Sequence, residues 1–271
     1  MEFIEAFLLG LLQGITEFLP VSSSGHLALA SALMGAELAP GITFEIVVHF
    51  GSFCSIVVYF HKRIGTILAD LFRSFSPHGI RQKRFMTDAS TRLSVIILLS
   101  MIPAGLAYFL LKDDIEAIFF NPFLVSFMLL VTGTLLFFTR FVKDPQKEVD
   151  VRRGFMMGVA QAMALIPGIS RSGSTISTGL FMGVNRDGVA NFSFLMVLPV
   201  LGGAMLYDLT RIAESGIDAV TIISLVIGFF TSFISGYFAL KYLIILLKRE
   251  KIHFFAYYCW IVGIFGLFYF S

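Results

Sequence analysis

Residues 10–26 read GLLQGITEFLPVSSSGH and break an apolar N-terminal run with a proline, three serines, a glycine and a histidine. Pro20 cannot continue a helix, so the apolar piece 3–19 ends there and a second piece, 27–36, begins after the polar loop. At about 1.5 Å per residue the second piece spans about 15 Å, half of a hydrocarbon core of about 30 Å. We therefore expect a re-entrant helix–loop–helix hairpin, whose irregular backbone is covered by protein or faces a wet cavity.

The composition of the whole chain is that of a membrane protein. Its 271 residues are 57% hydrophobic and 14% charged, with a mean hydropathy of +0.86. Water-soluble domains carry about half apolar and about a quarter charged residues. A net charge of +2 gives no reason to expect a nucleic-acid partner. The sequence predicts an all-α polytopic protein with six spans, at about 44–60, 92–111, 122–140, 190–207, 219–241 and 254–270.

A second polar loop, PGISRSGST at 167–175, separates the apolar pieces 154–166 and 175–184 and predicts a second re-entrant hairpin. At an offset of 148, residues 10–44 match 158–192 at eight of thirty-five positions, where roughly three are expected by chance. We expect one membrane domain, 1–271, built as an inverted-topology repeat whose hairpin tips meet near the midplane. The first repeat would cover about 1–140 and the second about 150–271.

Basic residues predict the orientation of the chain. The connections 61–92, 140–153 and 241–253 hold sixteen Lys and Arg residues, whereas 112–121 and 208–218 hold one each. By the positive-inside rule the first three connections are cytoplasmic and the last two external. The first hairpin then dips in from outside and the second from inside.

Charged side chains in the hairpins are the candidate site. An arginine at the membrane centre costs about 2.5–3.5 kcal/mol, so Arg171 requires a partner there. One interpretation is a structural ion pair with Glu17. The other is a guanidinium fork that binds phosphate oxygens, which the surrounding Ser/Gly loop at a helix start favours because it adds further anion donors.

The remaining polar residues allow several roles. Glu17 lies four residues after Gln13, on the same helix face, and is a candidate metal ligand or general base, with a structural hydrogen bond as the alternative. His26 is a candidate nucleophile or acid/base, or a satisfied structural histidine. Glu45 and His49 form another acid–histidine pair, which could hold a cation, line the way to the site or make an intrahelical hydrogen bond.

The strings QGITEFLPVSSSGH and PGISRSGST, together with FEIVVHFGS at 44–52 and FSFLMVLP at 192–199, resemble the undecaprenyl-diphosphate phosphatases, the bacitracin-resistance family of bacterial inner-membrane enzymes. The resemblance covers essentially the whole chain. It implies hydrolysis of undecaprenyl diphosphate to undecaprenyl phosphate and inorganic phosphate at the outer face of the inner membrane, with Mg²⁺ or Ca²⁺. The lipid carrier of cell-wall synthesis is thereby recycled and bacitracin resistance conferred. A polyprenyl diphosphate lipid and the bilayer are the implied partners, and a homodimer is left open.

Carried over by position, the family's motifs place the catalytic residues at Glu17, Ser23, His26 and Arg171, with Glu17 also the metal ligand. The implied substrate-binding residues are Gln13, Ser22, Ser24, Gly25, Ser170, Ser172, Gly173 and Thr175. This chain has Gln13 where many relatives have a second glutamate, which puts metal binding through a glutamate pair in doubt.

The sequence leaves the nucleophile open between His26, a serine and water. If a serine attacks, Ser23 is the best candidate, with His26 or Glu17 as its base. The competing function is a lipid-phosphate flippase or an anion carrier without hydrolysis, because inverted repeats with broken helices are typical of secondary carriers.

Overall fold

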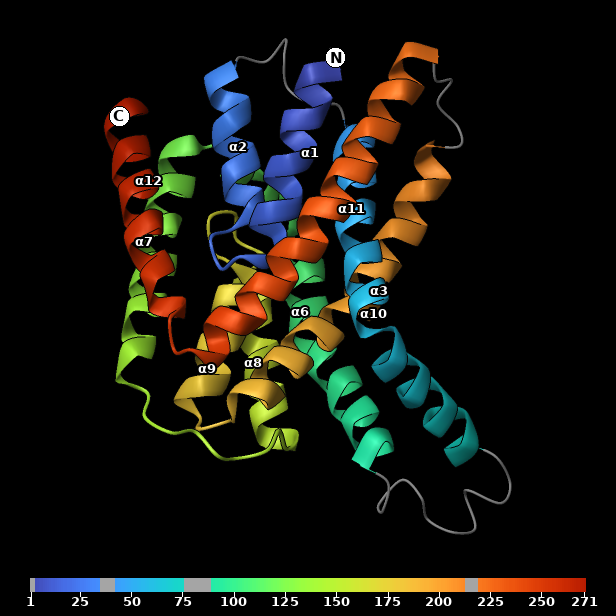
Figure 1. Ribbon diagram of the computed structural model, residues 1–271. Coiled ribbons are helices and arrows are strands. Elements are labelled where there is room, and N and C mark those ends of the chain that lie inside the picture. Colours follow the sequence, from blue (N-terminus) through green and yellow to red (C-terminus); the bar gives the residue numbers. More distant parts are fainter. Residues whose placement is uncertain (1–2, 35–41, 76–88, 213–218) are drawn as a thin grey trace.

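The computed structural model describes residues 3–34, 42–75, 89–212 and 219–271, and these ranges confirm the all-helical prediction (Figure 1). An isolated β-bridge joins Lys147 to Val184. The elements in chain order are α1 (Phe3–Phe18), α2 (Ser23–Met34), α3 (Ile42–Phe75), α6 (Ala89–Phe119), α7 (Pro122–Phe138), η1 (Thr139–Phe141), α8 (Val151–Met163), α9 (Arg171–Phe181), α10 (Arg186–Ile212), α11 (Ala219–Lys248), η2 (Ile252–Phe254) and α12 (Phe255–Tyr269).

Long apolar helices make this a multi-pass membrane protein. Five stretches of the described residues have the length and hydropathy to cross a bilayer: Thr43–Ser74, Ala89–Leu111, Pro122–Phe141, Ile222–Lys248 and Ile252–Tyr269. They correspond to five of the six predicted spans. The sixth, 190–207, lies within α10, which contains Pro199 and is not among the five.

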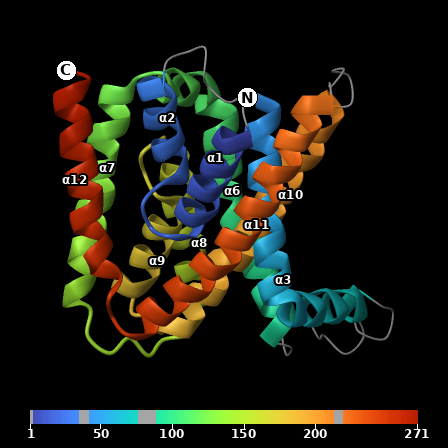
Figure 2. The same cartoon turned by 45° about the horizontal axis from the view of Figure 1, so that its top comes forward.

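The two hairpins lie in the middle of the bundle. Figures 1 and 2 show α1 and α2 entering from one end and α8 and α9 from the other, with their connecting loops side by side halfway along. The loops touch, because a Cβ built on Gly25 would come within 3.0 Å of the Gly168 Cα. The predicted meeting of the two tips is therefore observed.

The second helix of each hairpin begins earlier than predicted. We expected apolar pieces starting at 27 and 175, but α2 begins at Ser23 and α9 at Arg171. The residues just before them are N-caps: the Ser22 and Ser170 hydroxyls accept hydrogen bonds from the third backbone N–H that follows, at 3.2 and 3.1 Å. A hydroxyl cap can start a helix among polar residues, so hydropathy alone placed both starts too late.

Helices α3, α6 and α11 extend beyond the predicted spans. Helix α3 continues past residue 60 to Phe75, so part of the predicted connection 61–92 is helical. Figure 2 shows this second half of α3 turning away from the bundle. The buried hydroxyls of Ser74 and Thr91 lie 2.8 Å apart and join the end of α3 to the start of α6. Hydropathy located the apolar part of each helix but not its polar continuation.

Close backbone packing holds α1 against α11. A Cβ on Gly10 would lie 2.7 Å from the Gly228 carbonyl oxygen, and one on Gly14 would lie 2.4 Å from the Ser232 carbonyl oxygen. Only glycine permits such an approach, the usual role of small residues between membrane helices. This contact fixes the position of α1.

Candidate active site

Glu17 is the centre of the site. It lies in the last turn of α1 and is 8% exposed. Its Oε1 pairs with the Arg171 Nη2 at 2.5 Å, while its Oε2 accepts hydrogen bonds from Ser23 Oγ at 2.7 Å and Gln13 Nε2 at 2.9 Å. One carboxylate thus joins α1, the start of α2 and the start of α9.

Arg171 is the cation of this cluster and is only partly satisfied. The ion pair with Glu17, the structural alternative considered from the sequence, is present. However, the Arg171 Nη1 is buried and has no hydrogen-bond partner within the described residues. A guanidinium presents its donors in a fork that matches two phosphate oxygens. Arg171 can therefore hold Glu17 with one nitrogen and an anion with the other.

Ser23 is the first residue of α2 and the best-placed hydroxyl. It donates its proton to the Glu17 carboxylate across the loop. The residue before it, Ser22, has φ +70°, a conformation that costs a non-glycine residue about 1 kcal/mol or more. Such strain is typical of loops that must aim a functional group. The turn at Ser22 places the Ser23 hydroxyl beside the Glu17 carboxylate. This geometry suits a nucleophile next to its general base.

The Gln13 side chain leaves an acceptor unused. Its amide nitrogen donates to Glu17, whereas its carbonyl oxygen is buried without a partner in the part of the chain that the structure describes. Buried polar atoms without partners carry a penalty of about 1–3 kcal/mol, and a bound water, ion or ligand removes it. The free Gln13 oxygen and the free Arg171 nitrogen lie on either side of Glu17 in the hydrogen-bond chain.

His49 belongs to this cluster, although the sequence paired it with Glu45. Its Nδ1 makes an intrahelical hydrogen bond to the Glu45 backbone oxygen at 2.8 Å, which is one of the three roles considered from the sequence. Its Nε2 lies 3.9 Å from the Glu17 Oε2. The ring therefore brings a second potential cation to the same carboxylate from α3.

His26 has both ring nitrogens engaged. Its Nδ1 donates to the Ser22 carbonyl oxygen at 2.8 Å, which leaves Nε2 to accept from the Tyr258 hydroxyl at 2.9 Å. The two rings also stack, with centroids 5.5 Å apart. Among the described residues no hydrogen bond or ion pair joins His26 to Glu17 or Arg171. Tyr258 of α12 therefore holds the His26 ring in a fixed position.

The second tip is supported by Thr132 of α7. The Thr132 hydroxyl donates to the Gly168 carbonyl oxygen at 2.8 Å and accepts from the Ser170 backbone nitrogen at 3.0 Å. Gly168 has φ +94°, and a Cβ there would lie 2.4 Å from the Val125 carbonyl oxygen, so only glycine fits. The Thr132 side chain thus satisfies two backbone groups of an irregular loop. Backbone polar groups at membrane depth need such partners because no bulk water is present there.

The other predicted binding residues lie around the two tips. Ser24 is half-buried and its hydroxyl lies 3.3 Å from that of Ser22. The Ser172 hydroxyl donates to the Leu19 carbonyl oxygen at 3.4 Å and so links the tips. Thr175 lies one turn into α9, fully buried, and its hydroxyl is 2.6 Å from that of Ser193 on α10.

The oxygen atoms around Glu17 fit a divalent cation only with help from a ligand. Mg²⁺ and Ca²⁺ prefer oxygen ligands, and Mg²⁺ is often held by one or two carboxylates together with substrate phosphates. Glu17 supplies one carboxylate and Gln13 one unpartnered carbonyl oxygen. Within the described ranges no three His, Cys, Asp or Glu residues cluster as a metal site. The donor set fits a cation shared with a diphosphate.

Sequence reasoning singled out the acid, the serine and the arginine but missed two supporting residues and part of the role of a third. His49 was considered together with Glu45 as lining the way to the site, but not as a neighbour of Glu17, because that distance depends on how α3 packs. Tyr258 and Thr132 carry no signal in the sequence pattern. Each lies in a predicted span and reaches the site through tertiary packing.

Comparisons with known proteins show the family of the chain. The model of the family described as bacitracin resistance protein BacA matches residues 6–265. A Bacteroides fragilis protein named undecaprenyl-diphosphatase is 45% identical over 268 residues, 97% of each chain. Proteins of the same name from Bacteroides thetaiotaomicron and Salinibacter ruber are 42% and 41% identical over 268 and 269 residues, covering at least 97% of each chain.

Proposed function

The chain belongs to the bacitracin resistance protein BacA family, and from this membership we propose that it hydrolyses undecaprenyl diphosphate to undecaprenyl phosphate and inorganic phosphate. The observation that carries the proposal is the Glu17 carboxylate, which binds the Ser23 hydroxyl and the Arg171 guanidinium across two hairpin tips. Ser23 would act as the nucleophile, Glu17 as its base and Arg171 as the anion-binding cation, and their contact supports this assignment. The product would return the lipid carrier to cell-wall synthesis and underlie bacitracin resistance.

We place the enzyme in the bacterial inner membrane with six spans and two re-entrant hairpins, as an inverted repeat of about 1–140 and 150–271. The equivalent capping by Ser22 and Ser170, 148 residues apart, supports the repeat. The sixteen basic residues of three connections support the orientation. The site would then face the outer leaflet.

Arg171 and the helix starts would bind the diphosphate. The unpartnered Nη1 of Arg171 would take an oxygen of the terminal phosphate, while the lipid tail lies between helices. Glu17 and Gln13 would hold Mg²⁺ or Ca²⁺ together with the phosphates. When bound, the cation supplies neutralisation of the phosphate charge.

Ser23 would be the nucleophile. Its Oγ forms a bond to the terminal phosphorus as the bond from that phosphorus to the bridging oxygen breaks, and undecaprenyl phosphate leaves with the bridging oxygen and its electron pair. Glu17 takes the hydroxyl proton and passes it to the departing phosphate. Water then attacks the phosphoserine, Glu17 moves the water proton to Ser23, and inorganic phosphate is released. His26 would act as a positioning residue for the Ser22–Ser23 turn.

Phosphate release from the purified protein tests the function. In detergent, with no compartment to cross, an enzyme releases inorganic phosphate from undecaprenyl or farnesyl diphosphate, with and without a chelator as the cation control. A flippase or carrier releases none, and that result would overturn the proposal.

The nucleophile is tested separately by trapping. Substrate labelled on the terminal phosphate, followed by rapid denaturation, should leave label on Ser23 that resists acid and is released by alkali. Acid-labile label on His26 would assign the nucleophile to the histidine. Phosphate release without any protein-bound label would assign the attack to water.

A further inference from the structure

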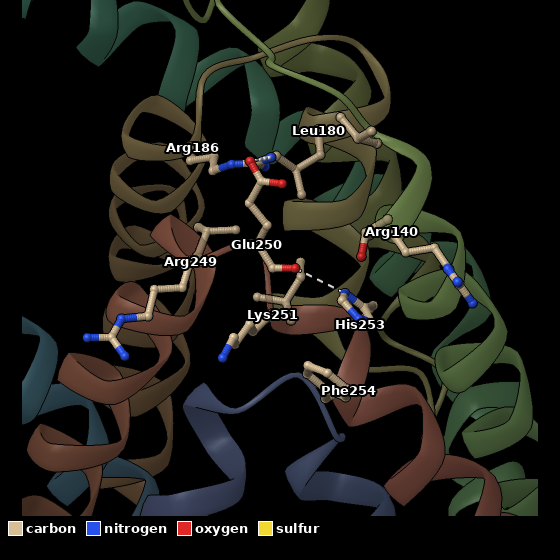
Figure 3. A pocket seen from close by; sticks show the side chains of 12 residues that line it. Arg140, Leu180, Arg186, Arg249, Glu250, Lys251, His253 and Phe254 are labelled. Atoms are coloured by element: carbon tan, nitrogen blue, oxygen red, sulfur yellow. Dashed lines mark hydrogen bonds and ion pairs between the residues drawn. The ribbon is translucent and has the colours of Figure 1, made fainter.

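A pocket of about 330 Å³ lies at the end of the bundle where η1, η2 and the ends of α9, α10 and α11 meet. Figure 3 shows the pocket from close by, and Figure 1 shows the elements around it. Its lining includes Leu180 of α9 but none of the tip residues Glu17, Ser23 and Arg171. Three membrane-spanning stretches end or begin at its wall, at Phe141, Lys248 and Ile252. The pocket therefore lies at the boundary between the hydrocarbon core and water.

Cationic side chains dominate the polar lining. Arg140, Arg186, Arg249 and Lys251 line the pocket together with one carboxylate, Glu250, and Arg186 pairs with it at 2.7 Å. Within the described residues the other three cations have no carboxylate partner, and Arg140 lies over the Phe137 and Phe141 rings. The lining keeps a formal excess of positive charge, which attracts anions.

The turn after α11 presents these groups. Glu250 adopts φ +61°, and the backbone nitrogens of Glu250 and Lys251 bond the carbonyl oxygens of Leu247 and Leu246 at 3.1 and 2.9 Å, closing the helix. Glycine is the usual residue in this conformation, so Glu250 is held here at a cost. Figure 3 shows the Glu250 carboxylate directed at Arg186, with the Lys251 and His253 side chains on the other side of the turn. The Arg140 and Arg249 side chains extend away on opposite sides of the pocket.

Apolar groups form the rest of the wall. Leu180 and Leu247 are buried beneath the charges, and Phe254 is 56% exposed at the pocket edge. A free anion needs no such surface, whereas a phospholipid carries a phosphate directly beside its acyl chains. Basic pockets between membrane helices on the positively charged side are typical sites for anionic headgroups.

We propose that this pocket binds the phosphate of an anionic phospholipid headgroup, such as phosphatidylglycerol, from the leaflet opposite the hairpin site. Arg186 and Lys251 contact the phosphate, Arg249 and Arg140 add long-range attraction, and the acyl chains lie along Phe254. The site is independent of the phosphatase reaction.

Native mass spectrometry of the purified full chain tests the proposal. The protein is supplied in detergent with phosphatidylglycerol or phosphatidylcholine of the same acyl chains. We expect selective retention of one phosphatidylglycerol by the wild type and about ten-fold or greater weakening in R249Q/K251Q, because two cations near a lipid surface are removed. The matched control, K62Q/R152Q, removes two exposed charges that lie outside the pocket lining and should retain the lipid.

A second variant, expected to strengthen lipid binding rather than weaken it, keeps the test decisive if R249Q/K251Q folds poorly. Glu250→Gln removes the competing carboxylate and should tighten phosphatidylglycerol binding, a gain that a purely structural role of the turn does not predict. Inorganic phosphate is added as a competitor. Displacement of the lipid by millimolar phosphate, equal retention of the two lipids, or unchanged retention in both pocket variants would each overturn the proposal.

Discussion

The two hairpins share a backbone plan but carry different chemistry. In each, a serine caps the second helix and a glycine three residues later donates to it. The first helical residue then differs: it is Ser23 in α2 and Arg171 in α9, two positions related by the offset of 148. Their partner Glu17 corresponds to Leu165 in the second hairpin. The shared plan builds two serine-capped helix starts, and the Glu17–Ser23–Arg171 cluster arises where the two sequences diverge.

The two equivalent glutamines are both buried but differ in their hydrogen bonds. Gln13 donates to Glu17 and keeps one free oxygen. Its counterpart Gln161 is 3% exposed, and both atoms of its amide are unpartnered among the described residues. Gln13 thus donates a hydrogen bond to the Glu17 carboxylate, whereas the Gln161 amide makes no hydrogen bond within the described residues. Substitutions at equivalent positions of the two hairpins can therefore separate chemistry from architecture.

The largest expected effect is at Ser23. We expect Ser23→Ala to lower kcat by about 10⁵-fold, as loss of an attacking hydroxyl does in other nucleophilic enzymes. Phosphate release measures it. The matched control is Ser24→Ala. It removes a neighbouring hydroxyl whose hydrogen bond, among the described residues, is to Ser22, and it should change the rate less than ten-fold. Equal losses in both variants would remove Ser23 from the nucleophile role.

Next comes Arg171, the counterpart of Ser23 in the second hairpin. We expect Arg171→Ala to lower kcat/KM by about 10⁴-fold, in the range found for arginines that neutralise phosphoryl transfer. Arg171→Lys keeps the charge but loses the fork and should recover only part of the rate. Full activity in the lysine variant would show that charge alone suffices.

Glu17 should follow, with about a 10³-fold lower kcat in Glu17→Gln, since general-base catalysis contributes about 10²–10⁴-fold. The amide keeps the shape and can still accept from Ser23, so binding should change less than kcat. Steady-state kinetics on a soluble short-chain diphosphate separate the two. A raised KM with unchanged kcat would remove the general-base role and leave Glu17 with substrate or cation binding alone.

The smallest effects come from the glutamine pair. Gln13→Met should lower activity about ten-fold, because it removes a hydrogen bond to the carboxylate. Gln161→Met should leave activity within about three-fold and raise thermal stability, because it replaces an unpartnered buried amide by an apolar chain of similar length. A marked loss of activity in Gln161→Met would show that this amide binds a ligand or water needed for the reaction.

The hairpins and the Glu17–Arg171 cluster were predictable because their cause is local and strong. Pro20 and the Ser/Gly loops end helices, and a buried arginine needs a partner. The starts of α2 and α9 were misplaced because hydropathy does not register a hydroxyl cap. The Tyr258 contact to His26 spans 232 residues, and the approach of His49 to Glu17 depends on helix packing. The spacing of residues along the sequence therefore could not predict either contact.

The glycines of α1 have a mechanical consequence. No side chain larger than hydrogen fits between Gly14 and α11. The backbone contact between α1 and α11 therefore determines where the Glu17 carboxylate, three residues further on, lies. We therefore expect helices α1 and α11 to move together. An opening that admits a long lipid tail would then come from movement of the remaining helices.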